Sequence, residues 1–175
     1  MAFASSVRKI LKTRCLSIYT DGSCSNNGKP GARAGWSFAI PLVSLLAGGP
    51  VPSDQKQTNN TGELTAIYEG LRYVCYLSSQ HSFQQVRVVS DSEYCIKGLT
   101  IWKKNYYPGS TRANNDTFVK ILGLIESLSR SQISVIYKHI NSHLSTSDKL
   151  LLSPEDQEDV FYNEQVDAMA GRFSV

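Results

Sequence analysis

The 175-residue sequence has few of the residues that mark secreted, zinc-binding or membrane proteins. Its four cysteines are widely spaced, and no two of them form a Cys-x-x-Cys pair. This usage predicts neither a disulfide framework nor a zinc site, so we expect a reduced, intracellular protein without a secretory leader. The longest apolar-rich stretch, residues 39–52, is interrupted by Pro, Ser and Gly. It is shorter than the roughly 20 residues of a membrane helix, and we expect no membrane partner.

The sequence also lacks a strong net charge, which is +3 at pH 7. Residues 87–138 nevertheless contain eight Lys or Arg and four Asp or Glu, whereas residues 148–167 contain seven acidic residues and one lysine. This asymmetry indicates either that the two regions contact different partners or simply that both are solvated surfaces. The first 20 residues hold four basic residues and no acidic one. We interpret residues 1–15 as a basic N-terminal arm of a cytoplasmic or nuclear protein, with organellar targeting as the less favoured alternative.

The length and the 41% hydrophobic content fit one compact domain, which we assign to residues 16–175. Apolar periodicity predicts strands and helices in the following order. Strands are expected at 17–20, 35–40 and within 42–51, then a helix at 61–77, a strand at 86–90, helices at 92–102 and 115–129, a strand at 133–139, and a helix at 161–172. The order predicts an α/β fold with a five-stranded mixed sheet and helices on both faces.

Two aspartates follow apolar strands in this pattern. Asp21 comes directly after "SIYT", and Asp91 comes directly after "VRVVS". The Asp21–Gly22 pair also fits a tight turn. However, strands separated by a helix tend to be parallel, and ligands of such sheets bind outside the carboxyl ends of the strands. Glu63, in the first turn of the first predicted helix, is placed to face the same crevice.

Carboxylates held close together repel one another unless a cation compensates them. Oxygen ligands without a compact cysteine or histidine cluster suit Mg²⁺, with Mn²⁺ as a substitute. Paired ions of this kind support in-line displacement at phosphorus. The residues therefore favour a phosphodiester substrate.

Five segments in order resemble the type 1 ribonuclease H family, whose members cut the RNA strand of RNA/DNA hybrids. The segments are "YTDGSCSNNG" (19–28), "QTNNTGEL" (57–64), "SDSEYCIKGLTIW" (90–102), "KHINSH" (138–143) and "NEQVDAMA" (163–170). The resemblance implies a ribonuclease H-like fold and a divalent-metal-dependent endoribonuclease. It further implies two Mg²⁺ ions per site, products with 5′-phosphate and 3′-hydroxyl ends, an RNA/DNA hybrid duplex as substrate, and a monomer.

The resemblance also implies catalytic residues. Asp21, Glu63, Asp91 and Asp167 match the metal-binding carboxylates, although the pattern around Asp167 alone indicates only a solvated helix face. His143 matches a mobile histidine that shuttles protons or helps product leave, a role suited to a side chain that titrates near neutrality.

Further matches concern the substrate. Asn27, Asn59 and Asn60 match positions that read RNA 2′-hydroxyls, although Asn-Gly and Asn-Asn pairs also fit turns. Lys56, Thr58 and Asn114 match a pocket for a DNA-strand phosphate. Lysine stands where arginine is often found, which predicts a looser grip. Trp102 matches an aromatic surface along the DNA strand, or else is a core residue, and Tyr106 is a candidate second aromatic.

The histidine loop departs from the family pattern, because Asp167 comes 24 positions after His143, a longer gap than in typical members. The added acidic segment, residues 145–159, is expected to be an irregular surface insertion; repulsion of nucleic acid and docking of a partner are the alternatives. Two rival functions stay open. One is a non-catalytic or weakly active hybrid-binding module of the same fold, and the other is a DNA nuclease or resolvase.

Overall fold

The computed structural model describes residues 15–142 and 144–175, so the predicted N-terminal arm lies, apart from Cys15, outside the described residues. The strands are β1 (Cys15–Ser25), β2 (Arg33–Ile40), β3 (Leu45–Pro50), β4 (Gln85–Ser90) and β5 (Ser134–His139). The helices are α2 (Asn59–Ser78), α3 (Glu93–Leu99), α4 (Asn115–Arg130), α5 (Thr146–Leu150) and α6 (Pro154–Phe173), with 3₁₀ turns η1 (Pro41–Val43) and η2 (Lys103–Asn105). None of the described helices has the length and apolar character that crossing a membrane requires.

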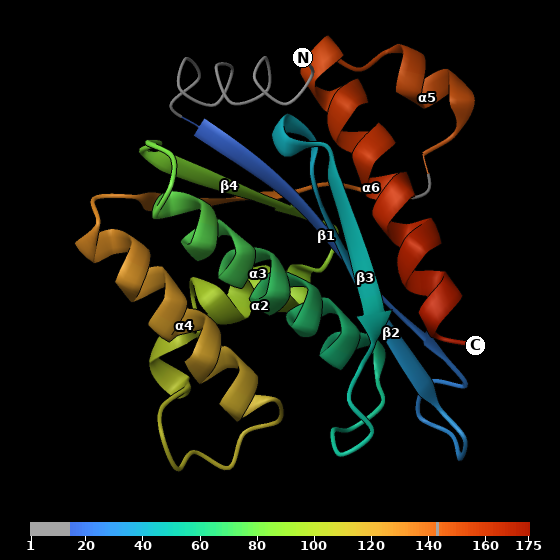
Figure 1. The fold of residues 1–175 in the computed structure, drawn as a ribbon. Coiled ribbons are helices and arrows are strands. Elements are labelled where there is room, and N and C mark those ends of the chain that lie inside the picture. The colour runs from blue at the N-terminus through green and yellow to red at the C-terminus, as the bar shows by residue number, and fades with distance from the viewer. Residues whose placement is uncertain (1–14, 143) are drawn as a thin grey trace.

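The five strands form one mixed sheet in the order β3-β2-β1-β4-β5 (Figure 1). Neighbours β1, β2 and β3 pair antiparallel as a meander, whereas β4 pairs parallel to both β1 and β5. Parallel pairs need crossover connections, and α2 precedes β4 while α3 and α4 precede β5. The predicted five-stranded mixed sheet is confirmed.

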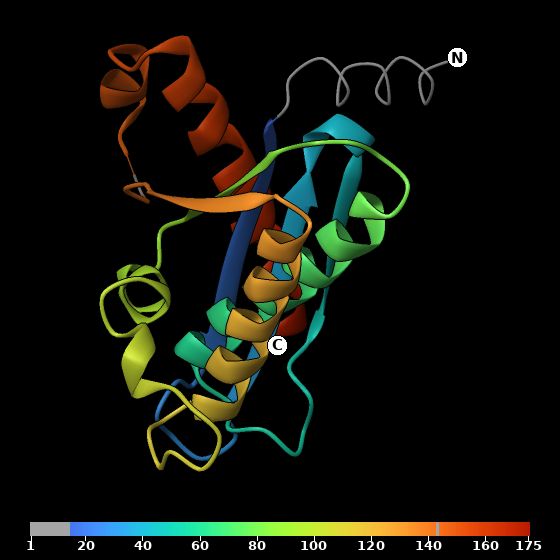
Figure 2. The same ribbon diagram turned by 90° about the vertical axis from the view of Figure 1, so that its left-hand side faces the viewer.

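Helices cover both faces of the sheet (Figures 1 and 2). Helices α2 and α4 pack on one face, and α6 packs on the other. Alternate residues of the central strands pack on opposite faces of the sheet, because successive side chains of a strand point in opposite directions. Ile18 and Val88 belong to the core beneath α2 and α4, whereas Tyr19 and Val89 pack with Val166 of α6.

The acidic segment before the last predicted helix differs from the expectation of an irregular insertion. It contains α5, and α6 begins at Pro154 instead of near residue 161. The first turns of α6 have no apolar periodicity, which is why the sequence pattern did not indicate them. The helix starts there because of its N-terminal residues. The hydroxyl of Ser153 accepts a hydrogen bond from the backbone amide of Asp156 at 3.1 Å, and Pro154 occupies the first turn. Acidic side chains in that turn interact favourably with the positive end of the helix dipole.

Candidate metal centre

The two aspartates meet because of the register between the central strands. Asp21 lies inside β1 and pairs with Ser37 of β2, so the prediction that it ends the strand is wrong. The parallel pairing of β1 with β4, however, ends at Tyr19 and Val89. Asp21 and Asp91 each lie two residues beyond that pair. Both aspartates therefore stand at the carboxyl end of the parallel ladder, as the strand pattern predicted.

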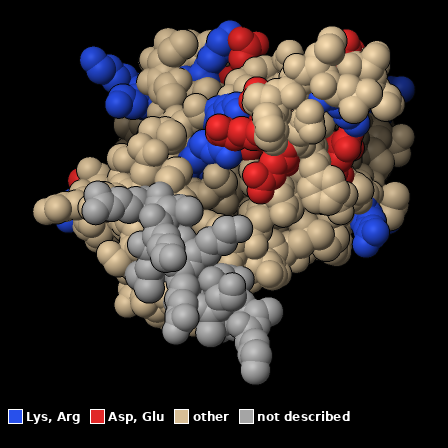
Figure 3. Space-filling model, turned by 90° about the horizontal axis from the view of Figure 1, so that it is seen from above, with Lys and Arg blue, Asp and Glu red and all other residues tan. Residues whose placement is uncertain are grey.

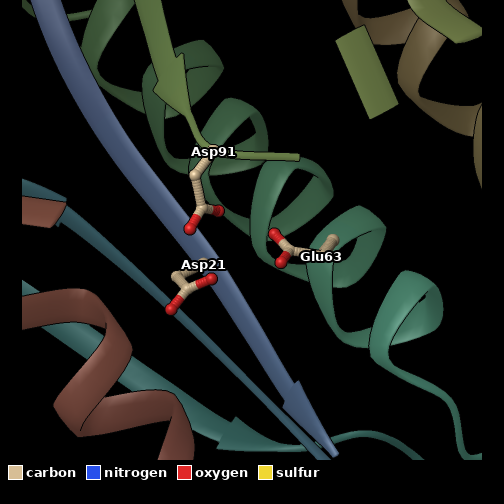
Figure 4. A group of neighbouring side chains, drawn as sticks. All are labelled: Asp21, Glu63 and Asp91. Atoms are coloured by element: carbon tan, nitrogen blue, oxygen red, sulfur yellow. The ribbon is translucent and has the colours of Figure 1, made fainter. Parts of the chain in front are cut away.

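Glu63 is brought to the aspartates by a close contact between α2 and the sheet. A Cβ atom on Gly22 would lie 2.0 Å from the Glu63 amide nitrogen, and one on Gly62 would lie 2.6 Å from the Gly35 carbonyl oxygen. Only glycine fits at such an approach. The Asp21–Gly22 pair is thus a helix–strand contact and not a turn. In Figure 4 the side chains from β1, α2 and the residue after β4 point toward one another.

The three carboxylates form a buried acidic cluster. One oxygen from each of Asp21, Glu63 and Asp91 lies within 4.8 Å of the others, and Asp21 and Glu63 are each only 4% exposed. Burial, and then the charge of Asp91, raise the pKa of Asp21 to about 8. Burial and the charge of Asp21 likewise raise the pKa of Glu63. Two buried acids that resist ionisation indicate that a positive charge is missing.

The donor atoms fit a hard divalent cation. They are all oxygens, as Mg²⁺ prefers, and Oε2 of Glu63 is buried without a hydrogen-bond partner among the described residues. The Gly22 amide donates to Oδ1 of Asp21 at 2.9 Å and orients that carboxylate. No lysine or arginine is among the described residues that line the surrounding cavity. The described residues thus supply ligands there without a lysine or arginine as counter-charge.

The cluster opens into a cavity of about 410 Å³, here called the carboxylate cavity. Asp167 of α6 lines it as an exposed residue, although it is not among the three within 4.8 Å. Asn59 of α2 lines it as well. His143 lies outside the described residues, but its neighbour Ser142 is part of the lining. The structure therefore places Asp167 beside the predicted carboxylates.

Two residues at this site have no role in the sequence prediction. Asn163 lines the carboxylate cavity, is 5% exposed, and has a buried Oδ1 without a hydrogen-bond partner among the described residues. It precedes Asp167 by four positions on α6, and this spacing could have placed both on one helix face. Nε2 of His139 lies 3.0 Å from the carbonyl oxygen of Asp91, a hydrogen bond that holds the chain after β4.

A second cavity, of about 490 Å³, holds most of the residues predicted to bind phosphate. We call it the basic cavity, because Lys56, Arg112 and Lys120 line it together with two acidic residues, Asp54 and Asp116. The remaining parts form one hydrogen-bonded unit. Thr58 caps α2 by accepting from the Thr61 amide at 3.1 Å, and the Thr61 hydroxyl donates to Oδ1 of Asn114 at 3.2 Å. Thr61 and Asn114 both line the cavity.

The other predicted substrate residues are less closely gathered. The backbone amide of Asn59 donates to Oδ1 of Asn27 at 3.2 Å, and this hydrogen bond joins the loop after β1 to the start of α2. Asn60 is exposed and lines neither cavity. Trp102 is 38% exposed and lies between α3 and η2, because α3 ends at Leu99 and not near residue 102.

The suggestion that Tyr106 is a second exposed aromatic is wrong. Its ring stacks on Phe118 with 3.9 Å between centroids and belongs to the core. The adjacent Tyr107 is 57% exposed.

Comparison with known proteins finds both relatives in sequence and solved structures of the same fold. The RNase H family model matches residues 13–174. A ribonuclease H of Wolbachia sp. subsp. Drosophila simulans is 30% identical over 89% of this chain and 92% of its own length. Ribonuclease HI of Rickettsia prowazekii is 31% identical over 74% of this chain and 80% of its own length. Among solved structures, LC11-RNase H1 in complex with an RNA/DNA hybrid has the same fold, with a TM-score of 0.56, 17% identity, and coverage of 90% of this chain and 97% of that one.

Proposed function

The chain belongs to the RNase H family, a family of endoribonucleases, and on this premise we propose that it hydrolyses the RNA strand of RNA/DNA hybrids with the help of two Mg²⁺ ions. We further propose that the products carry 5′-phosphate and 3′-hydroxyl ends. The observation that carries the proposal is the cluster of Asp21, Glu63 and Asp91, which lies at a strand end in a cavity whose described lining residues include no lysine or arginine. Mn²⁺ is expected to substitute.

Different residues of the chain would bind the ions and the substrate. Asp21, Glu63 and Asp91 would hold the ions, with Asp167 as the exposed fourth carboxylate at the edge of the cavity. Bound Mg²⁺ would activate water for in-line attack and stabilise the leaving oxygen. The amide of Gly22 keeps Asp21 oriented toward the centre of the cluster. We further propose, from the resemblance to the family, that His143, which lies outside the described residues, accepts or delivers a proton in the reaction.

Recognition of the RNA strand would come from the asparagines at the start of α2. Asn27 and Asn59 are joined by a hydrogen bond, and Asn59 reaches the carboxylate cavity. Amide side chains can both donate to and accept from a ribose 2′-hydroxyl, which DNA lacks. Asn60 would extend this contact from its exposed position on the same turn of α2.

The DNA strand would lie across the other side of α2. The basic cavity offers Lys56 and the linked hydroxyl and amide groups of Thr61 and Asn114 to one phosphate, with Thr58 fixing Thr61. Trp102 would pack against the sugars farther along that strand. We propose that the protein acts as a monomer, because one chain supplies the residues of both cavities.

A substrate panel tests the proposal. Purified protein is incubated with Mg²⁺ and an RNA strand labelled at its 5′ end, which is single, paired to RNA, or paired to DNA; a labelled DNA duplex completes the panel. We expect cleavage of the RNA only when it is paired to DNA. Extension of the product by a DNA polymerase, which requires a 3′-hydroxyl, tests the product ends. Cleavage of duplex DNA at an equal rate, or no cleavage with either Mg²⁺ or Mn²⁺, would contradict the proposal.

A further inference from the structure

A third cavity lies next to the basic cavity and has no part in the proposed reaction. It has a volume of about 200 Å³, and its walls include Trp36 of β2, Tyr68 of α2 and Lys120 of α4. We call it the aromatic cavity. The Trp36 ring is fixed there, because its Nε1 donates to the Pro50 carbonyl oxygen at 3.2 Å.

The aromatic and basic cavities are adjacent and share part of their walls. Gln55, Thr117 and Lys120 line both of them. Along α2, Thr61 lines the basic cavity, while Thr65 and Tyr68, four and seven positions later, line the aromatic one. Residues at this spacing share one face of a helix. A strand that leaves the basic cavity along α2 therefore meets the aromatic cavity next.

The charges around the aromatic cavity suit a nucleotide. Nζ of Lys120 lies 6.0 Å from the centre of the Tyr68 ring, and Lys120 also lines the basic cavity. Glu69 is the acidic residue in the lining, and it forms an ion pair with Arg72 at 3.0 Å. Aromatic side chains beside a cationic groove are the usual combination for binding single-stranded nucleic acid without sequence preference.

We propose that the aromatic cavity binds one unpaired nucleotide of the DNA strand, where that strand continues past the end of the hybrid. The base lies against Trp36 and Tyr68, and Lys120 neutralises the phosphate that links this nucleotide to the basic cavity. The proposal rests on the proposed function, because it needs the DNA strand in the basic cavity. It predicts a preference for hybrids in which the DNA strand extends beyond the RNA.

The test measures the dissociation constant for labelled hybrids at one fixed salt concentration, because phosphate contacts make affinity salt-dependent. The non-cleaving Asp91→Asn variant is used as background, and the hybrids are blunt, or extended by a few thymidines at the 3′ or the 5′ end of the DNA strand. A stacked base is worth about 1–3 kcal/mol, so an extension at one end should tighten binding by roughly 5-fold or more. Adding Tyr68→Ala should remove most of that gain and leave the affinity for the blunt hybrid nearly unchanged.

Two further variants make the result specific to this cavity. Tyr76→Ala, on the same helix but outside the cavity and 56% exposed, should retain the full gain. Lys120→Gln, an exposed change that should not disturb folding, should lower the gain and reduce the salt dependence of binding to the extended hybrid. No gain from either extension, or a gain that Tyr68→Ala and Lys120→Gln both retain, would overturn the proposal. Failure of the wild-type protein to bind or cut the blunt hybrid would instead overturn the proposed function.

Discussion

Strand β1 carries residues of two buried acidic sites that differ in how their charge is compensated. At the first site, Asp159 of α6 is fully buried, yet Arg87 donates to both of its carboxylate oxygens at 2.9 and 3.0 Å. Lys138 lies 2.6 Å away, and the Tyr19 hydroxyl donates to Asp159 at 2.7 Å. Figure 3 views the end of the molecule where α6 begins and shows basic and acidic side chains in contact there. At the second site, two residues along β1 from Tyr19, Asp21 faces Glu63 and Asp91, and no lysine or arginine is among the lining residues that the structure describes.

The pKa values move in opposite directions at the two sites. Burial raises the pKa of Asp159, but hydrogen bonds from Lys138, Tyr19 and Arg87 outweigh it and hold the pKa below its ordinary value. Burial and Asp91 raise the pKa of Asp21 to about 8. A charge that the chain compensates itself serves to join elements of the fold, here α6 to β1, β4 and β5. A charge left uncompensated is kept for a ligand.

The largest expected effect is on catalysis at the uncompensated site. Asp91→Asn removes one ligand oxygen charge, and we expect cleavage of the hybrid to fall by at least about a thousandfold, or more than about 4 kcal/mol in the barrier. Hybrid affinity and the melting temperature should stay near the wild-type values, because the change relieves repulsion. Single-turnover cleavage and fluorescence anisotropy measure the two quantities. Asp148→Asn, at an exposed position on α5, is the matched control, and equal rates for the two variants would contradict the assignment.

The next effect is on stability at the compensated site. Asp159→Asn removes the buried charged partner of Arg87, whose side chain is 15% exposed, and leaves it the ion pair with the largely exposed Glu155 at 2.9 Å. Breaking a buried ion pair from one side typically destabilises by at least about 3 kcal/mol. Urea unfolding should show this loss, whereas Asp148→Asn should stay within about 0.5 kcal/mol of the wild type. A loss below 1 kcal/mol would show that the ion pairs do not hold α6.

The comparison also shows which features a sequence can predict. The strand order and the meeting of Asp21, Glu63 and Asp91 follow from apolar periodicity and from the tendency of parallel strand ends to lie together. The Asp159 network has no such local signal, because its partners Tyr19 and Arg87 are 140 and 72 residues away. The start of α6 was missed because its first turns are acidic and lack an apolar period, although Ser153 and Pro154 are a typical helix start. Burial of Tyr106 in place of Tyr107 depends on the packing of Phe118.

The two sites also predict opposite responses to pH. In EDTA, Asp21 ionises near pH 4 when unfolded but only near pH 8 when folded, so its contribution lowers the free energy of unfolding as pH rises between these values. Asp159 contributes stability above its unfolded pKa, and this contribution is lost as pH falls below about 4. Urea unfolding at pH 5.5 and 7.5 should show a fall for the wild type that is smaller for Asp21→Asn, in which burial still raises the pKa of Glu63.

Metal addition provides the matching control. Mg²⁺ at a hundredfold excess over its dissociation constant should restore about 2.7 kcal/mol to the wild-type protein at pH 7.5, and clearly less to the Asp21→Asn variant. Equal pH slopes for the two proteins in EDTA, together with equal Mg²⁺ effects, would show that the acidic cluster carries no stored repulsion.

The smallest predicted effect tests whether the ion pairs of Asp159 or the N-terminal cap of α6 contribute more to the stability of this helix. Ser153→Ala removes the side-chain cap of α6, and such a loss costs about 1 kcal/mol. Ser145→Ala removes the same kind of cap from α5, a five-residue helix, and should have less effect because fewer contacts depend on that helix. Urea unfolding at neutral pH measures both. If Ser153→Ala destabilised the protein as much as Asp159→Asn, the cap would stabilise the helix that carries Asp167 as much as the buried network of Asp159 does. The expected order, with Asp159→Asn well ahead, makes the compensated charge the anchor of α6 and so of the fourth carboxylate beside the uncompensated cluster.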